Sequence, residues 1–325
     1  MSPTVGSNAS FGFGQETVWA SGTPTINNFV PFISESFKLE RNIVTSDAIR
    51  GSSARSIWRQ GSETTSGELN VEIQPTGPMG TLIKHALGRV VTAGPSGTDN
   101  YYVHNIFPSG SLPEGLRVQI DRDSKFFVYK GCKINELTLE CAVGDPLTAT
   151  FAFLGSDEAL SAVGTAATSV STLNPLTFDE GVFTMDGTSV EINSFSLTVN
   201  NNLKDDKGEL GSRYRVSIPR SGFRDVNGTL NMEFDDFTLY QKYVNGTEAA
   251  IALKFTADDK IGSADTYKLW IECPRIVFSG ETPNVDGPDL VYHDMPFIAF
   301  ATDSPTEDWQ RYELRIKLVN GSSSI

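Results

Sequence analysis

The sequence is poor in the residues that enzyme and metal sites most often use. It has 3 cysteines and 3 histidines among 325 residues, and none stands at a metal-ligand spacing or beside a partner motif. It also has no phosphate-binding glycine loop after a strand and no nucleophile elbow. We therefore predict that the protein is not an enzyme, and we expect no catalytic residue, no metal site and no cofactor.

Basic residues and long apolar runs are scarce as well. There are 26 Lys and Arg against 40 Asp and Glu, a formal net charge of −14. This charge argues against a protein that binds nucleic acid through its phosphates. No apolar run approaches the length of a membrane-spanning helix, and no basic-plus-apolar leader opens the sequence. We expect no membrane association and synthesis in a reducing cytoplasm.

What the sequence does contain favours strands. Val, Ile, Thr, Phe and Tyr are frequent, and 29 Gly and 16 Pro supply many turns, so the predicted fold class is mainly β. The length suggests about two domains.

The most informative stretch runs from Phe29 to Gly88. A strand around Phe37 and Leu39 is followed by about twenty polar residues without apolar periodicity. A second strand over 68–73 then alternates cleanly, and a short helix over 80–86 ends before the glycine.

The same order of elements occurs a second time. Residues 193–197 resemble 35–39 at an offset of 195 − 37 = 158, and a second Arg- and Gly-rich excursion leads to a strand over 229–235. A second short helix over 237–244 ends at Gly246, and 246 − 88 is again 158. We interpret this order as an internal duplication.

The chain divides accordingly into four predicted parts: an N-terminal arm (1–28), a first domain (29–155), a linker of small and polar residues (156–174) and a second domain (175–325). Further patterns predict these elements: a loop-rich insert (89–115), a hairpin over 116–129, a hairpin over 137–153, a closing pair at 268–276 and 297–300, and a last strand over 309–319, partly at a sheet edge.

Residues 11–155 contain, in this order, the segments GFGQETVWASGTP, FVPFISESFKLERN, AIRGSS, GELNVEI, GTLIKHALG and YKGCKINELTLECAVGDPLTATFAFLG. By the order of these segments, this part of the chain resembles the tail tube proteins of long-tailed bacteriophages. The resemblance extends more weakly over 175–320.

The resemblance implies duplicated β-sandwich or barrel domains, each with a short helix and a long extended loop. It further implies stacked rings, with six domains per ring, so that a two-domain chain would form a trimer of pseudo-sixfold symmetry. The partners implied are other copies of the chain and the tape measure, terminator and distal tail proteins. Phage DNA would pass through the lumen without specific binding, and the protein would be assembled in the host bacterial cytoplasm and reside in the virion tail.

In that picture, strand carboxylates would line the channel and repel DNA phosphates, and arginines in the excursions at 41–66 and 201–227 would meet acidic groups of the next ring. The expected lumen residues are Glu68, Glu72, Glu136, Glu140, Glu233 and Asp235. The expected inter-ring residues are Arg50, Arg55, Arg59, Arg213, Arg215 and Arg220.

Three rival hypotheses remain open on the sequence. A two-domain Ig-like binding or decoration module of a virion would be a monomer with short loops. A tail terminator or distal tail ring of the same fold family would form rings but not the main tube. An enzyme would need a pocket that gathers histidines or paired carboxylates.

Overall fold

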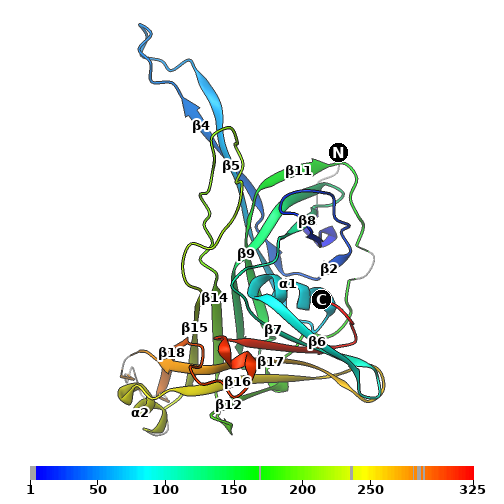
Figure 1. Cartoon of the computed structure of the whole chain (residues 1–325), viewed down its shortest axis with the longest axis vertical. Helices are drawn as coiled ribbons and strands as arrows, with labels where there is room; N and C mark the ends of the chain where they lie inside the picture. The colour runs from blue at the N-terminus through cyan, green and yellow to red at the C-terminus, as the bar shows by residue number, and fades with distance from the viewer. Residues whose placement is uncertain (1–4, 168–169, 235–236, 281, 284–286, 288–289) are drawn as a thin grey trace.

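The computed structural model describes residues 5–167, 170–234, 237–280, 282–283, 287 and 290–325. The chain is 50% strand and 9% helix, which confirms the prediction of a mainly β fold. It is elongated, with one β-hairpin projecting far beyond the body at one end of the long axis (Figure 1).

The strands are β1 (Ser10–Glu16), β2 (Asn28–Val30), β3 (Ser34–Glu35), β4 (Lys38–Thr45), β5 (Trp58–Glu72), β6 (Gly88–Ser96), β7 (Tyr101–Pro108), β8 (Gly115–Asp121), β9 (Phe126–Ala142), β10 (Thr148–Gly155), β11 (Asp157–Ser161), β12 (Gly181–Met185), β13 (Thr188–Ser189), β14 (Ser194–Asn200), β15 (Asp225–Glu233), β16 (Ala249–Lys260), β17 (Thr266–Phe278), β18 (Tyr292–Ala299) and β19 (Arg315–Asn320). The helices are α1 (Gly77–Leu87) and α2 (Thr238–Asn245), with 3-10 turns at Gly6–Asn8, Phe178–Glu180 and Asp308–Arg311.

One antiparallel sheet runs through both halves of the chain, in the order β4, β5, β10, β9, β14, β15, β18. Its middle is the pairing of β9 with β14, in which residues 136–142 lie opposite 194–200. We call this junction the seam, because it joins the first half of the chain to the second.

Alternation along these strands decides which side faces the core. Leu69 and Val71 of β5, Leu139 of β9, Leu197 of β14 and Leu230 of β15 are all fully buried on one side. Neighbouring side chains point the other way, since successive strand residues face opposite sides of a sheet. The predicted hairpins over 116–129 and 137–153 are both present, as β8–β9 and β9–β10.

Helix α1 forms where the sequence predicts it. Its N-cap Thr76 accepts a hydrogen bond from the backbone N–H of Met79, and Gly88 ends it at a φ of +121°, which a side chain would disfavour. Leu82 and Ile83 are fully buried. His85, on the same helix, is 3% exposed and lies in the interior rather than on the surface.

Helix α2 follows β15 as α1 follows β5. It ends at Gly246, which has a φ of +60° and donates its N–H to the carbonyls of Lys242 and Tyr243. This is the left-handed cap that glycine favours.

The segment expected to be an N-terminal arm includes a core strand. β1 pairs with β8 through seven residues and with β2, and Phe11 and Phe13 are both fully buried. Glycines alternate with the phenylalanines in this strand, and they hid its apolar face in the sequence.

A further sheet has the order β13, β12, β16, β17, β19, β7, β6. It corrects two expectations. The insert at 89–115 is the β6–β7 hairpin rather than a loop, and its pattern was concealed because β6 is mostly exposed. The last strand is β19 alone, and it lies between β17 and β7 rather than at an edge.

The polar excursion after Phe37 is a long β-hairpin. β4 pairs with β5 from Lys38 to Thr45, and only residues 46–57 form the connecting loop. Neither side of the distal hairpin is buried against the body, so its sequence shows no alternation for prediction to use.

Candidate functional site

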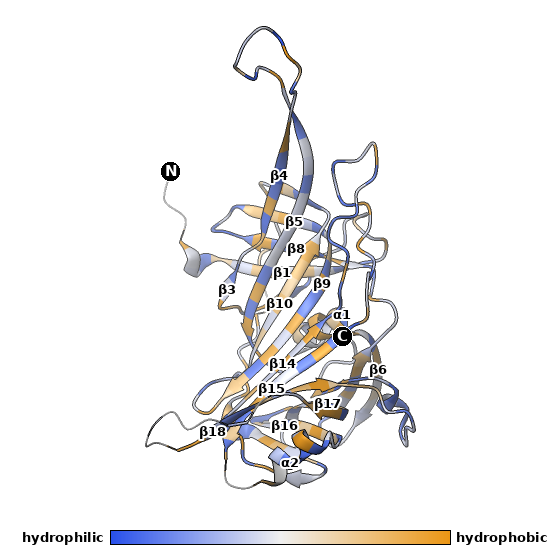
Figure 2. Cartoon of the chain, turned by 90° about the vertical axis from the view of Figure 1, so that its left-hand side faces the viewer, coloured by the Kyte–Doolittle hydropathy of each residue, from blue (hydrophilic) through white to orange (hydrophobic). Residues whose placement is uncertain are grey.

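One side of the seven-stranded sheet is mostly polar from β5 to β15, and at β18 it carries Asp294 between Tyr292 and Pro296. Figure 2 looks toward this side, with β5, β10, β9, β14 and β15 lying next to one another. We call it the polar face, and cross-strand pairing assigns to it Glu68, Asn70, Glu72, Thr148, Thr150, Glu136, Thr138, Glu140, Ser194, Ser196, Thr198, Asn200, Asp225, Asn227, Thr229, Asn231, Glu233 and Asp294.

Side chains on the polar face hydrogen-bond from strand to strand. Asn70 donates to Ser34 over 2.9 Å, and Thr150 donates to Asn70 over 2.5 Å. Thr138 and Thr198 meet across the seam with their hydroxyl oxygens 3.0 Å apart. These bonds hold the polar side chains in fixed rows, as cross-strand pairs do in sheets generally.

From β5 to β18 the charges on this face are all negative, while Lys38 of edge strand β4, opposite Ser66 and 2.6 Å from Glu40, lies on the same side. No Lys or Arg occurs in the six segments 66–72, 136–142, 148–152, 194–200, 225–233 and 292–298. Glu68, Glu72, Glu136, Glu140 and Glu233, all expected at the lumen, share this face. Asp235 lies outside the described residues.

Sequence reasoning missed two carboxylates of the polar face. Asp225 lies opposite Asn200, and Asp294 lies opposite Asn231 and accepts its hydrogen bond over 2.7 Å. The signal available was the alternation of β15, which places Asp225, Asn227 and Asn231 on one side. No comparable signal existed for Asp294, since its strand carries a proline and a histidine.

The sheet has two open ends. Within the described part of the chain, β3 and β4 pair with β5 alone. At the far end, β18 pairs with β15 along its length but with β17 only through Phe297–Ala299, so among the described residues Tyr292–Pro296 have a strand partner on one side only. Open edges carry unpaired N–H and C=O groups, which favour pairing with another chain.

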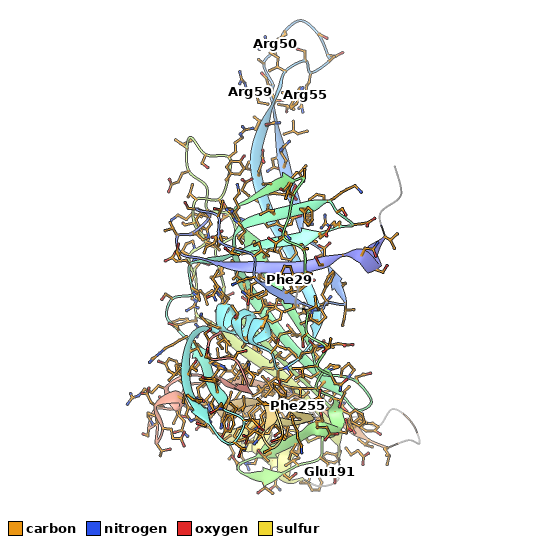
Figure 3. The ribbon with its side chains drawn as sticks, turned by 90° about the vertical axis from the view of Figure 1, so that its right-hand side faces the viewer. Phe29, Arg50, Arg55, Arg59, Glu191 and Phe255 are labelled. Carbon is orange, nitrogen blue, oxygen red and sulfur yellow. The ribbon has the colours of Figure 1, made fainter. Side chains whose placement is uncertain are left out.

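The projecting hairpin carries three of the expected contact arginines. Arg50, Arg55 and Arg59 all lie at its exposed end (Figure 3). Arg55 pairs with Asp47 at 2.9 Å. No ion pair or hydrogen bond joins the side chains of the other two to a described residue, so both are free for an outside partner.

The second excursion lies against the base of this hairpin. The backbone N–H of Glu63 donates to the carbonyl of Arg213 over 2.8 Å. The buried carboxylate of Glu63 lies 3.0 Å from Arg41 and 3.9 Å from Arg213, and Arg213 also donates to Gln60. The two excursions, which the sequence treats as separate loops, therefore contact one another within a single chain.

Arg215 and Arg220 make contacts within the chain, and the inter-ring role expected of them stays a prediction. Arg215 is 8% exposed and donates to the carbonyls of Thr65, Gly155 and Asp205. Arg220 donates to the carbonyls of Asn201, Ser109 and Gly110 and to the Asn201 side chain. Burial lowers the pKa of both guanidinium groups.

The remaining candidate chemistry is structural. His104 is fully buried and lies 2.8 Å from the Thr92 hydroxyl and 3.1 Å from Asn320 Oδ1. The three cysteines are free. No group of three or more His, Cys, Asp or Glu that could hold a metal is found within the described part of the chain. No described helix is long and apolar enough to cross a membrane.

A polar sheet face, two open sheet edges and a projecting hairpin define a structural subunit built to assemble with copies of itself. A family model described as phage tail tube protein matches residues 6–299. The chain therefore belongs to the phage tail tube protein family, and it is a structural component of the virion tail that assembles into a tube. A search of curated proteins found no match.

Proposed function

We propose that three copies of this chain form a ring of pseudo-sixfold symmetry, that the rings stack into the tail tube, and that the polar face lines its lumen. One observation carries the proposal. The two halves join in one antiparallel sheet whose polar face carries only acidic charges from β5 to β18, with Lys38 on the edge strand β4, and whose two ends are open.

Ring closure follows from the open edges. An exposed edge is a liability unless it is paired, and closing a sheet into a barrel removes both edges. In the proposed ring, the β3–β4 edge of one subunit meets the β18 end of the next, much as β14 meets β9 at the seam. Two halves per chain make six units in a trimer.

The acidic face suits a channel for DNA. Carboxylates repel phosphates, so the lumen would offer the genome no adhesive surface while it slides through during ejection. The acidic residues are distributed unevenly among the strands. β5 and β9 contribute four of them to the polar face, whereas β14 contributes only Ser194, Ser196, Thr198 and Asn200.

We also propose that the two halves arose by duplication and form the two tube domains, 29–155 and 175–325, with β1 of the N-terminal segment packed in the first. The central strands support this, since GELNVE in β5 corresponds to GTLNME in β15, and each strand is followed by a short helix capped by glycine. The proposed partners are the tape measure, terminator and distal tail proteins, with assembly in the host cytoplasm.

Negative-stain microscopy combined with mass measurement of the purified protein tests the proposal. Hollow tubes, or rings with the mass of three chains, are expected. Rings that never stack would favour the terminator or distal tail assignment. A chain that stays monomeric at high concentration would contradict the proposal and favour the decoration module.

A further inference from the structure

The hairpin tip, residues 46–57, exposes apolar side chains together with its arginines. Ile49 is 99% exposed, and Ile57 and Trp58 at the start of β5 are 41% and 63% exposed. A two-stranded hairpin buries little surface of its own and is marginally stable in water. Exposed apolar groups on such an element indicate that another surface covers them.

A groove of matching character lies at the lower end of the seam. Two adjoining hollows of about 280 and 420 Å³ share Cys141, Ala142, Ser194 and Phe195 in their lining. Phe178, Val182 and Ile192 make one part apolar. We call the two hollows together the seam groove.

The charges of the seam groove are opposite to those of the tip. Glu140, Asp145 and Glu191 line it, and no Lys or Arg does. The tip instead presents Arg50, Arg55 and, at its base, Arg59, with Asp47 as the acid paired to one of them. An apolar anchor surrounded by opposite charges favours a specific contact.

The geometry matches head-to-tail stacking. Figure 3 places the arginines of the tip at one end of the long axis and Glu191, with Phe255 above it, near the other. Each chain has one such tip and one seam, so every tip in a stack has one groove to enter. The 280 Å³ hollow has room for an Ile side chain, since a cavity of roughly 150 Å³ already holds a benzene-sized group.

We propose that the hairpin tip of a chain in one ring docks in the seam groove of a chain in the next ring, with Ile49 inserted beside Cys141 and Arg50 facing Glu191. This inference rests on the proposed function and adds to it the surface that receives the hairpin. The occupant is a second copy of this chain.

Thiol crosslinking in assembled tubes tests the docking. An Ile49→Cys variant treated with a short bismaleimide is expected to give a ladder of covalent oligomers, linked between positions 49 and 141 by peptide mapping. Cys132 and Cys273 are buried whereas Cys141 is partly exposed, so Cys141 is the native thiol expected to react. The ladder should disappear in an I49C/C141S double variant, and Leu160→Cys, an equally apolar exposed position on β11, should give none.

Charge exchange gives a second, independent test. Glu191→Arg or Arg50→Glu alone should slow tube growth at least several-fold, and the two changes combined should restore much of the rate. Tubes that form normally but show neither the 49–141 crosslink nor the rescue would overturn the docking while the tube function stands. Failure of the unmodified chain to form rings or tubes would overturn the proposed function and the docking with it.

Discussion

Asn200 of β14 donates a hydrogen bond to the carboxylate of Glu136 on β9 over 2.7 Å, across the seam between the two halves of the chain. The bond lies on the polar face, so the junction that makes the sheet continuous also helps to order its charged surface. The continuity of the sheet and the placement of its acidic side chains therefore depend on the same junction, and the function we propose depends on both.

The first prediction concerns the charge of the polar face. Glu72→Lys or Glu233→Lys should leave ring assembly intact, because both positions are exposed, but should impair DNA passage by adding a phosphate-binding group. Infectivity and DNA ejection of phage carrying the variant measure this. Asp258→Lys on β16, an exposed acid outside the polar face, is the matched control. Normal DNA ejection by phage carrying the polar-face variants would contradict the assignment of these residues to the lumen.

The second prediction concerns the contact between the two excursions. Arg215→Ala leaves the buried carbonyls of Thr65 and Gly155 without their donor, which should lower the free energy of unfolding by about 1–3 kcal/mol. Hydrogen exchange at the hairpin base should accelerate as well. Arg213→Ala, at a side chain 51% exposed, should cost less than about 1 kcal/mol. Equal effects of the two changes would contradict the assigned role.

The third prediction uses two glycines at corresponding places in the repeat. A Cβ on Gly67 would lie 2.5 Å from Phe37 Cα, and one on Gly228 would collide with the Ser196 carbonyl. Gly67→Ala and Gly228→Ala should each destabilise the chain by about 1–3 kcal/mol in denaturant unfolding. Gly208→Ala, with open space around it, should be nearly neutral. If only one of the two alanine variants is destabilised, the two positions are not structurally equivalent.

The fourth prediction is a pH dependence. Burial, with smaller contributions from Lys84 and Lys133, lowers the pKa of His85 from 6.5 to about 3. The unfolded chain binds a proton at this residue below pH 6.5 while the folded chain does not, so stability is lost as the pH falls from 6.5 toward 3. His85→Gln should reduce that slope by up to about 1.4 kcal/mol per pH unit. Parallel stability curves for the two proteins would contradict a neutral buried imidazole.

Much of the fold could be predicted where one strand face is buried. The strands around Leu69, Leu139 and Leu230 alternate because one side packs in the core, and α1 ends at Gly88 because the chain there needs a positive φ. The exposed β4–β5 hairpin and β6 escaped prediction because neither of their sides is consistently buried. Local patterning cannot signal such strands.

The site was only partly predictable for a related reason. Alternation places Glu68 and Glu72 on one side of β5, but only the register of β9 against β14 shows that both halves share that side. The intrachain role of Arg215 depends on contacts with Thr65 and Gly155, 150 and 60 residues away. Sequence spacing carries no information about such contacts.

Cryo-electron microscopy of assembled tubes, at a resolution that shows side chains, tests the central claim most directly. The account predicts that Thr138, Thr150 and the carboxylates of Glu72 and Glu136 face the lumen, with the sheet continuous from one subunit to the next. A reconstruction that places these residues on the outer wall, or buries them between subunits, would contradict it.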